Sequence, residues 1–287
     1  MEGPWTHNVL CHSPDVRFGT MNLFPDLVAF DIDGTLLRSD GSLSARVCQA
    51  IKGIKCRGCT VVLSTGRPWK QVKTIVEELA VVDYCICLNG ASIFKSDGSL
   101  LKSNAMPEEL TLTGPEIARK LFPNIALAAD MADGRHIWDE HFVHDFPSDF
   151  EMEPIRVSDA LSAIDGPVLT WLLDCKDADP RKVTSTIRGL LPHGIEVRPS
   201  GLETPEIVKS GVSKGSALNE VANMTGIAPA QAWAFGDGLN DIEMFQWAGY
   251  SFAMENGHPE LLSIADRVAP SHDADGIAVV LEDLLVS

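Results

Sequence analysis

Short apolar runs alternate with segments of helical periodicity in the first third of the chain. The runs are 26–31 (DLVAFD), 60–64 (TVVLS) and 84–88 (YCICL), and residues 42–51 and 69–80 between them place apolar side chains at helical spacing. Strands that are apolar throughout are buried on both faces, and strands that alternate with helices pair in parallel through right-handed crossovers. This pattern predicts an α/β fold built on a Rossmann-like parallel sheet.

The alternation weakens after about residue 92, where helix and strand signals mix, and returns near residue 212. A chain of 287 residues is long enough for two domains of the usual 100–200 residues. We therefore predict that a second, α+β domain is inserted into the open α/β sheet. The predicted division is a flexible extension at 1–20, a core domain at 21–91 and 206–287, and an inserted domain at 92–205.

The chain carries 40 acidic and 23 basic residues, a formal net charge of −17. Nucleic-acid binding depends on basic residues that neutralise phosphates, and the sequence has no run of Lys and Arg. An acidic surface is repelled by anionic membranes, and no stretch reaches the roughly 18–20 apolar residues of a membrane-spanning helix. Residues 1–20 also lack the apolar run of a signal peptide. These features predict a cytoplasmic protein that binds neither nucleic acid nor membrane, and they leave the oligomeric state open.

Seven cysteines make an odd number, and their spacing is not that of a disulfide framework. Cys56 and Cys59 followed by Cys85 and Cys87 resemble two pairs of zinc ligands. However, Cys85 and Cys87 alternate along an apparent strand, which favours core packing over a zinc site.

Two aspartates follow the first apolar run, in Asp31-Ile32-Asp33-Gly34-Thr35. Ligands of open α/β sheets bind just beyond such strand ends. Continued strand geometry places Asp31 and Asp33 on the same side, and Gly34 permits a sharp turn. A calcium loop requires Gly and Glu at the sixth and twelfth positions, which here hold Leu36 and Ser42, so that alternative fails.

A second acidic cluster, Gly236-Asp237-Gly238-Leu239-Asn240-Asp241, follows another apolar strand and opens a helix. Four carboxylates at neighbouring strand ends repel one another unless a cation lies among them. Oxygen ligands of this kind suit Mg²⁺. A magnesium site is therefore predicted at this edge of the sheet.

Two further segments supply groups that bind phosphate. Thr65 offers a hydroxyl and Gly66 lets the backbone approach closely at the end of the second strand, while Lys214 adds a positive charge before a helix. Phosphoryl transfer depends mainly on positioning and charge stabilisation. Carboxylates, a hydroxyl and a cation from separate strand ends therefore predict phosphoryl-transfer chemistry.

The segment Gly211-Val-Ser213-Lys-Gly215 also matches the nucleophile elbow of serine hydrolases, with Asp237 and then His258 or His272 downstream. That alternative leaves both acidic clusters and the Thr65 segment without a role. A pattern with three fixed positions also arises easily by chance, so the serine-hydrolase hypothesis is the weaker one.

The order of these segments resembles a known superfamily. DIDGT (31–35), STGR (64–67), Lys214 and GDGLND (236–241) are similar to the four motifs of the haloacid-dehalogenase-like hydrolases. LNGA (88–91) and GVSKG (211–215) further resemble the Cof-type phosphatases of this superfamily, whose large type IIB (C2) cap lies between the second and third motifs. The segment 271–278 is similar to their tail motif, and the resemblance covers the chain from about residue 22 onward.

The resemblance implies a phosphatase that acts on a small phosphorylated metabolite. It implies that Asp31 attacks phosphorus and forms an aspartyl-phosphate, and that Asp33 is the general acid and base. It further implies two sets of ligands. Mg²⁺ is held by Asp31, the Asp33 backbone carbonyl and Asp237, with Asp241 behind through water; the phosphoryl group is held by Thr65, Gly66, Lys214, Asn240 and the Ile32 backbone N–H.

The sequence leaves the substrate open among sugar phosphates, nucleotides and phosphorylated vitamin precursors. A phosphomutase and a non-catalytic binding protein on the same scaffold remain alternatives. Relatives often have Met-Gly-Asn where this chain has Met254-Glu255-Asn256, which puts the role of that loop in doubt. Trp138 and the histidines at 136, 141 and 144 either line the inserted domain's binding surface or belong to its core and exterior.

Overall fold

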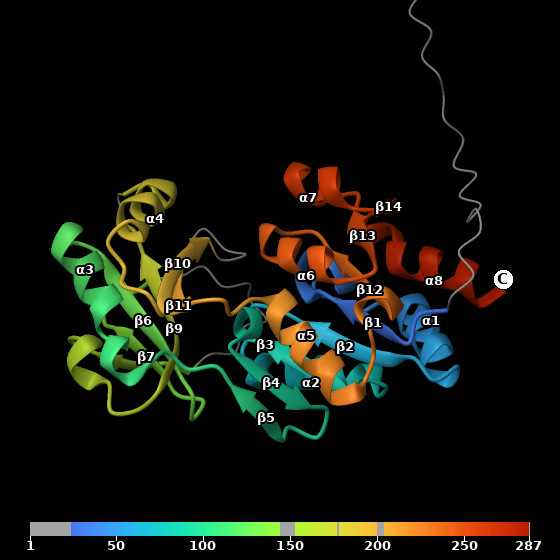
Figure 1. The fold of residues 1–287 in the computed structure, drawn as a ribbon, viewed down its shortest axis with the longest axis horizontal. Helices are drawn as coiled ribbons and strands as arrows, with labels where there is room; N and C mark the ends of the chain where they lie inside the picture. Colours follow the sequence, from blue (N-terminus) through green and yellow to red (C-terminus); the bar gives the residue numbers. More distant parts are fainter. Residues whose placement is uncertain (1–23, 144–152, 177, 200–203, 287) are drawn as a thin grey trace, which may run out of the picture.

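The computed structural model describes residues 24–143, 153–176, 178–199 and 204–286. The predicted extension at 1–20 and His144 lie outside the described residues. The described chain forms two lobes, each built on its own β-sheet (Figure 1). None of the described helices has the length and apolar character needed to cross a bilayer.

The larger sheet has eight strands in the order β14-β13-β12-β1-β2-β3-β4-β5. The first six pair in parallel, and β4 and β5 extend the sheet as antiparallel strands. The bounds are β1 Leu27–Phe30, β2 Thr60–Ser64, β3 Tyr84–Cys87, β4 Ser92–Lys95, β5 Leu100–Ser103, β12 Ala232–Gly236, β13 Tyr250–Met254 and β14 Arg267–Ala269.

Helices cover both faces of this sheet, because its central strands are apolar on both sides. One face packs against α1, α2 and α8, and the other against α5, α6 and α7. The predicted α/β fold with a parallel sheet is therefore confirmed. The bounds are α1 Ala45–Cys56, α2 Trp69–Leu79, α5 Lys214–Thr225, α6 Ile242–Trp247, α7 Pro259–Ile264 and α8 Gly276–Val286.

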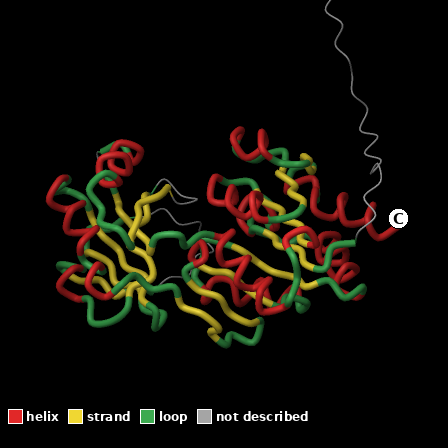
Figure 2. Tube along the Cα trace, in the orientation of Figure 1, coloured by secondary structure: helices red, strands yellow, loops and turns green. Residues whose placement is uncertain are grey.

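The smaller sheet has six strands in the order β10-β11-β9-β6-β7-β8, and all pairs are antiparallel except β7 with β8. Helices α3 (Thr113–Leu121) and α4 (Pro180–Arg188) pack on one of its faces. Figure 2 shows them on the outer side of this lobe. The strand bounds are β6 Ala126–Met131, β7 His136–Asp139, β8 Ile155–Val157, β9 Val168–Asp174, β10 Ile195–Pro199 and β11 Pro205–Lys209.

The predicted limits of the inserted domain, 92 and 205, do not coincide with the two sheets. Strands β4 and β5 belong to the larger sheet, and β11 belongs to the smaller one. The end of the strand–helix alternation was interpreted as a domain boundary. Antiparallel neighbours need no helix between them, so the larger sheet continues past the point where that alternation stops.

Candidate active site

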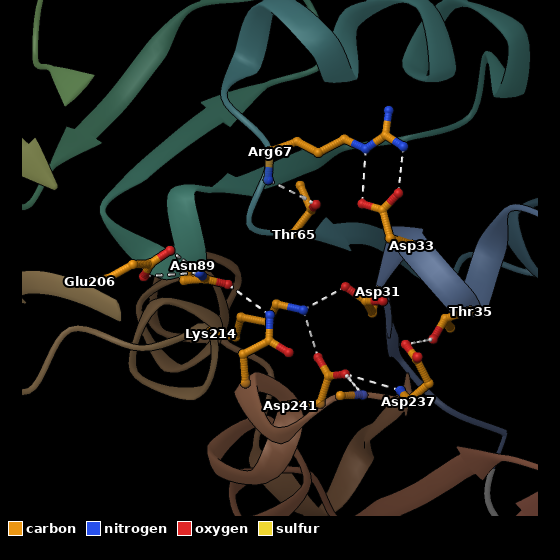
Figure 3. Close-up of polar contacts among 12 residues, drawn as sticks. Asp31, Asp33, Thr35, Thr65, Arg67, Asn89, Glu206, Lys214, Asp237 and Asp241 are labelled. Atoms are coloured by element: carbon orange, nitrogen blue, oxygen red, sulfur yellow. Dashed lines mark hydrogen bonds and ion pairs between the residues drawn. The ribbon is translucent and has the colours of Figure 1, made fainter. Parts of the chain in front are cut away.

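The predicted site residues meet at the carboxyl edge of the larger sheet. Asp31 follows β1, Thr65 follows β2 and Asp237 follows β12, while Lys214 opens α5. Since β12, β1 and β2 are adjacent and parallel, these three strand ends lie side by side. Figure 3 shows the resulting group of polar side chains.

Lys214 lies at the centre of the group and is 1% exposed. Its Nζ donates to Asp31 Oδ1 at 2.5 Å and to Asp241 Oδ1 at 2.7 Å. Burial alone lowers the pKa of a lysine, but Asp241 and Asp31 outweigh it and raise the pKa of Lys214, which stays charged. The helix start is fixed by a capping box, in which Ser213 Oγ accepts from the Ser216 N–H at 3.1 Å.

Asp241 is the best-anchored carboxylate of the site. Its Oδ2 accepts the backbone N–H groups of Asp237 at 3.0 Å and Gly238 at 2.9 Å, and the residue is fully buried. A Cβ at Gly236 would lie 2.6 Å from Asp241 Cγ, so the turn closes around the carboxylate only with glycine there. The Gly-Asp-Gly sequence thus folds to hold Asp241 toward Lys214.

A second close contact joins the loop after β1 to the loop after β12. Thr35 Oγ1 donates to Asp237 Oδ1 at 3.0 Å. Gly34 has φ +77°, and a Cβ there would lie 2.3 Å from Asp237 Oδ2. Glycine at position 34 is therefore required both for the backbone conformation and for the approach of the Asp237 carboxylate.

Asp31, Asp237 and Asp241 form an acidic cluster whose ligand oxygens lie within 4.8 Å of one another. Among the described residues, no other group of three or more His, Cys, Asp or Glu side chains lies close enough together to hold a metal ion. Burial raises the pKa of Asp31 well above its usual range, against the opposing effect of Lys214, and Asp241 and Asp237 raise it further. Burial and then Asp241 likewise raise the pKa of Asp237. The negative charges of these neighbouring carboxylates repel one another, and a small divalent cation bound among them would relieve that repulsion.

Asp33 does not join this cluster. The strand ends at Phe30, so the expectation of continued strand geometry is wrong. The Asp33 carboxylate instead accepts two hydrogen bonds from Arg67, from Nε at 2.9 Å and from Nη2. Arg67 is 5% exposed, whereas the Asp33 side chain is 48% exposed and open to solvent. Sequence reasoning missed Arg67 as a partner, although it ends the STGR segment.

The remaining predicted residues surround the cluster. Ile32 is buried directly after Asp31, Thr65 is fully buried, and Gly66 is exposed at the same edge. The Thr65 hydroxyl accepts the Arg67 backbone N–H at 3.1 Å, which shapes the turn after β2. Asn240 lies beside the cluster and is held by Asn89.

Asn89 connects the two lobes at the site. Its Oδ1 accepts from Asn240 Nδ2 at 3.0 Å, and its Nδ2 donates to Glu206 Oε1 and Oε2 at 3.1 and 3.2 Å. Glu206 lies in β11 of the smaller sheet and is also 3.7 Å from Arg198 Nε. Burial raises the pKa of Glu206, while Arg198 and Asn89 oppose that rise.

Sequence reasoning gave Asn89 no role beyond its place in the LNGA segment, and it did not identify Glu206. Asn89 carried a signal, because it follows the third apolar strand, whereas nothing in the sequence around Glu206 marks it.

The residues of the rival serine-hydrolase pattern have other contacts. The Ser213 hydroxyl caps α5. His258 Nδ1 accepts the Glu260 backbone N–H at 3.2 Å at the start of α7, and His272 Nε2 lies 3.0 Å from Ser39 Oγ. These contacts assign structural roles to the elbow serine and to both histidines.

Comparison with known proteins agrees with this geometry. A family model described as haloacid dehalogenase-like hydrolase matches residues 28–281. The 5-amino-6-(5-phospho-D-ribitylamino)uracil phosphatase YitU of Bacillus subtilis is 27% identical over 268 residues, covering 92% of this chain and 98% of its own.

Two solved structures share the fold. A haloacid dehalogenase-like hydrolase from Bacteroides thetaiotaomicron superposes with a TM-score of 0.76 at 25% identity, covering 91% of this chain and 99% of its own. The HAD subclass IIB sugar phosphatase BT4131 superposes with a TM-score of 0.77 at 21% identity, covering 91% and 100%. Because the family model spans nearly the whole described chain, this protein belongs to the haloacid dehalogenase-like hydrolases.

Proposed function

We propose that this protein is a magnesium-dependent phosphatase that hydrolyses a small phosphorylated metabolite through an aspartyl-phosphate on Asp31. The observation that carries the proposal is the buried contact of Lys214 with both Asp31 and Asp241 at the edge of the parallel sheet. The family assignment and the phosphatase relatives support the same reaction class.

Asp31 is the proposed nucleophile because its carboxylate directly follows the end of β1 and is held by Lys214, while the residue keeps a small exposed fraction of 5%. Lys214 holds Oδ1 of Asp31, and the other carboxylate oxygen, Oδ2, is the proposed attacking atom. The same ammonium group is placed to neutralise charge on the phosphoryl oxygens as the leaving group departs.

The acidic cluster fits the predicted Mg²⁺. Asp31 and Asp237 would hold the ion together with the backbone carbonyl of Asp33, and Asp241 would support it from behind. When bound, Mg²⁺ supplies charge that draws the phosphoryl group to Asp31 and stabilises its oxygens. Thr35 keeps the Asp237 carboxylate oriented toward the cluster.

Asp33 is the proposed acid and base. In the first step an Asp31 oxygen bonds to phosphorus, the bond from phosphorus to the substrate oxygen breaks, and Asp33 gives that oxygen its proton. In the second step Asp33 takes a proton from water, the water oxygen bonds to phosphorus, and the bond to Asp31 breaks. Two hydrogen bonds from Arg67 orient the Asp33 carboxylate, and 48% of the Asp33 side chain stays accessible to solvent.

Thr65, Gly66, Asn240 and the Ile32 backbone N–H are the proposed phosphoryl ligands. Thr65 and Gly66 are held in place by the turn that Arg67 closes, and Asn240 is oriented by Asn89. The smaller lobe is the proposed cap, and the Asn89–Glu206 contact sets its position over the site. The six described cysteines are free, which supports a proposed location in the reducing cytoplasm.

Hydrolysis of p-nitrophenyl phosphate tests the reaction class. We expect activity with Mg²⁺, none in excess EDTA, recovery on adding Mg²⁺ back, and none for Asp31→Asn. Lys102→Met, which removes a partly exposed ion pair between Lys102 of β5 and Glu220 of α5, is the control and keeps full activity. Activity that survives both EDTA and Asp31→Asn would refute the mechanism.

A further inference from the structure

Two segments at the carboxyl edge of the larger sheet have no part in the proposed mechanism. One is the loop at 254–258, which follows β13, and the other is the tail segment at 271–278, which follows β14. The sheet order β14-β13-β12-β1 places both segments beside the strand ends that carry Asp237 and Asp31 (Figure 1). Their contacts with those strand ends therefore bear on the geometry of the site.

Asn256 joins the tail segment to the loop that follows β1. Its Nδ2 donates to the Gly34 carbonyl at 2.8 Å, and its Oδ1 accepts the His272 backbone N–H at 3.1 Å. Strand β13 lies two positions from β1 in the sheet, roughly 10 Å at ~4.8 Å per strand, so the loop that carries Asn256 reaches across the end of β12. A carboxamide has both a donor and an acceptor, and Asn256 uses both.

The backbone of the same loop holds the strand end that carries Asp237. The His258 N–H donates to the Asp237 carbonyl at 2.7 Å. Glu255 is exposed, and its backbone N–H donates to the Ala269 carbonyl at 2.9 Å, which ties the loop to β14. The Asn256 side chain and the His258 backbone thus reach two different strand ends of the site.

The Gly34 carbonyl lies between two groups of the proposed site. Asp33, whose backbone carbonyl is a proposed Mg²⁺ ligand, precedes Gly34, and Thr35 follows it. The Thr35 hydroxyl donates to Asp237 Oδ1 at 3.0 Å. Because the peptide group is planar, a hydrogen bond to the Gly34 carbonyl also restricts the Thr35 N–H. Asn256 is therefore placed to fix the loop after β1 relative to the loop after β12.

We propose that Asn256 is a positioning residue, which sets the distance between the loops after β1 and β12 and thereby sets the affinity of the site for Mg²⁺. The inference rests on the proposed phosphatase function and adds to it a residue that acts through the Gly34 carbonyl. Partners that orient metal ligands from outside the coordination sphere typically contribute about 10–100-fold to metal affinity. Asn256 is exposed and acts through a backbone carbonyl, so we expect the lower end of that range, about tenfold.

The test measures Mg²⁺ affinity without turnover. Wild type and Asn256→Ala, each freed of metal with EDTA and dialysed, are titrated with Mg²⁺ while the melting temperature is followed. We expect Asn256→Ala to need about tenfold more Mg²⁺ than wild type for half of the maximal rise. An equal requirement would overturn the proposal. If wild type itself shows no rise with Mg²⁺, the proposed magnesium dependence fails and this inference fails with it.

Ser39→Ala is the matched control, because the Ser39 side chain joins the chain after β1 to the same tail segment. Its Oγ donates to Asp273 Oδ2 at 2.6 Å and lies 3.0 Å from His272 Nε2, so each variant loses two side-chain hydrogen bonds. We expect the two variants to have similar melting temperatures in EDTA and Ser39→Ala to keep the wild-type Mg²⁺ requirement. A purely structural role for Asn256 would raise the requirement of both variants alike or of neither, and either result would refute the proposal.

Kinetics separate Mg²⁺ binding from the chemical step. For hydrolysis of p-nitrophenyl phosphate by Asn256→Ala, the Mg²⁺ concentration that gives half of the maximal rate should rise about tenfold, while the rate at saturating Mg²⁺ stays close to that of wild type. Asn256→Gln keeps a donor and an acceptor and should need less Mg²⁺ than Asn256→Ala. A lower saturated rate at an unchanged Mg²⁺ requirement, or equal requirements for Asn256→Gln and Asn256→Ala, would refute the role assigned to Asn256 and leave the phosphatase reaction intact.

Discussion

Replacing Lys214 with methionine tests whether the site is a set of buried charges balanced by one cation. Methionine keeps much of the side-chain length but removes the ammonium group that lies 2.5 Å from Asp31 Oδ1 and 2.7 Å from Asp241 Oδ1. Removing one partner of a buried ion pair costs about 3–5 kcal/mol, because the remaining charge is left without compensation. Here three carboxylates would remain within 4.8 Å of one another.

This loss should be visible in thermal unfolding. At about 2–4 °C for each kcal/mol in a domain of this size, Lys214→Met is expected to lower the melting temperature by roughly 6–20 °C in EDTA. Mg²⁺ should restore part of the loss, since a ligand at 100 times its Kd stabilises the native state by about 2.7 kcal/mol. Activity should stay about 10²–10³-fold low even with Mg²⁺, as on removal of one transition-state donor.

The control for this prediction is Lys102→Met, which removes a partly exposed ion pair with Glu220 at 2.8 Å. Exposed pairs contribute about 0–1 kcal/mol, so its melting temperature should change by no more than a few degrees. Circular dichroism and urea unfolding, each with EDTA and with Mg²⁺, provide the measurements. If Lys214→Met is as stable in EDTA as this control, the claim that Lys214 compensates the charges of Asp31 and Asp241 is refuted.

Three further predictions concern single residues around the site. Gly34→Ala forces a Cβ to within 2.3 Å of Asp237 Oδ2 at φ +77°, so it should abolish most activity and lower the free energy of unfolding by about 1–3 kcal/mol. Gly58→Ala is the control for backbone strain alone, because Gly58 has φ +91° and no atom lies within 4 Å of the added Cβ; this variant should keep activity. Because burial raises the pKa of Glu206, the native state favours its protonated carboxyl more than the unfolded chain does, so wild-type stability relative to Glu206→Gln should fall as pH rises above the ordinary range of a glutamate carboxyl. A difference that is flat or opposite in urea titrations across that rise would contradict the assignment. Asn89→Asp replaces the donor to Glu206 with a second carboxylate and should lower stability by about 1–3 kcal/mol, measured by the same titrations.

The sequence predicted the parts of the molecule that local patterns encode. Strand ends followed by Asp31, Thr65 and Asp237 were visible because apolar runs stop abruptly at polar residues, and parallel pairing brings such ends together. A helix was also predicted at Lys214, where α5 begins. These features depend on neighbours within a few residues, which is why sequence reasoning reached them.

The features that sequence reasoning missed depend on contacts between distant segments. Arg67 and Asp33 are 34 residues apart, and Asn89 and Glu206 are 117 apart. The placement of β4 and β5 in the larger sheet depends on antiparallel pairing with β3, which leaves no helix to mark it. Neither hydrophobic periodicity nor motif spacing carries information on such pairings.

Identifying the phosphorylated residue tests the central claim most directly. The Asp33→Asn variant keeps the proposed nucleophile but lacks the base for the second step, so with Mg²⁺ and a phosphomonoester that has a good leaving group it should accumulate phosphoenzyme. Acid quenching and peptide mass spectrometry should then find one phosphoryl group on the peptide that contains Asp31, released by hydroxylamine and absent from Asp31→Asn. A phosphoryl group on Ser213 or any other residue, or turnover retained by Asp31→Asn, would contradict the account.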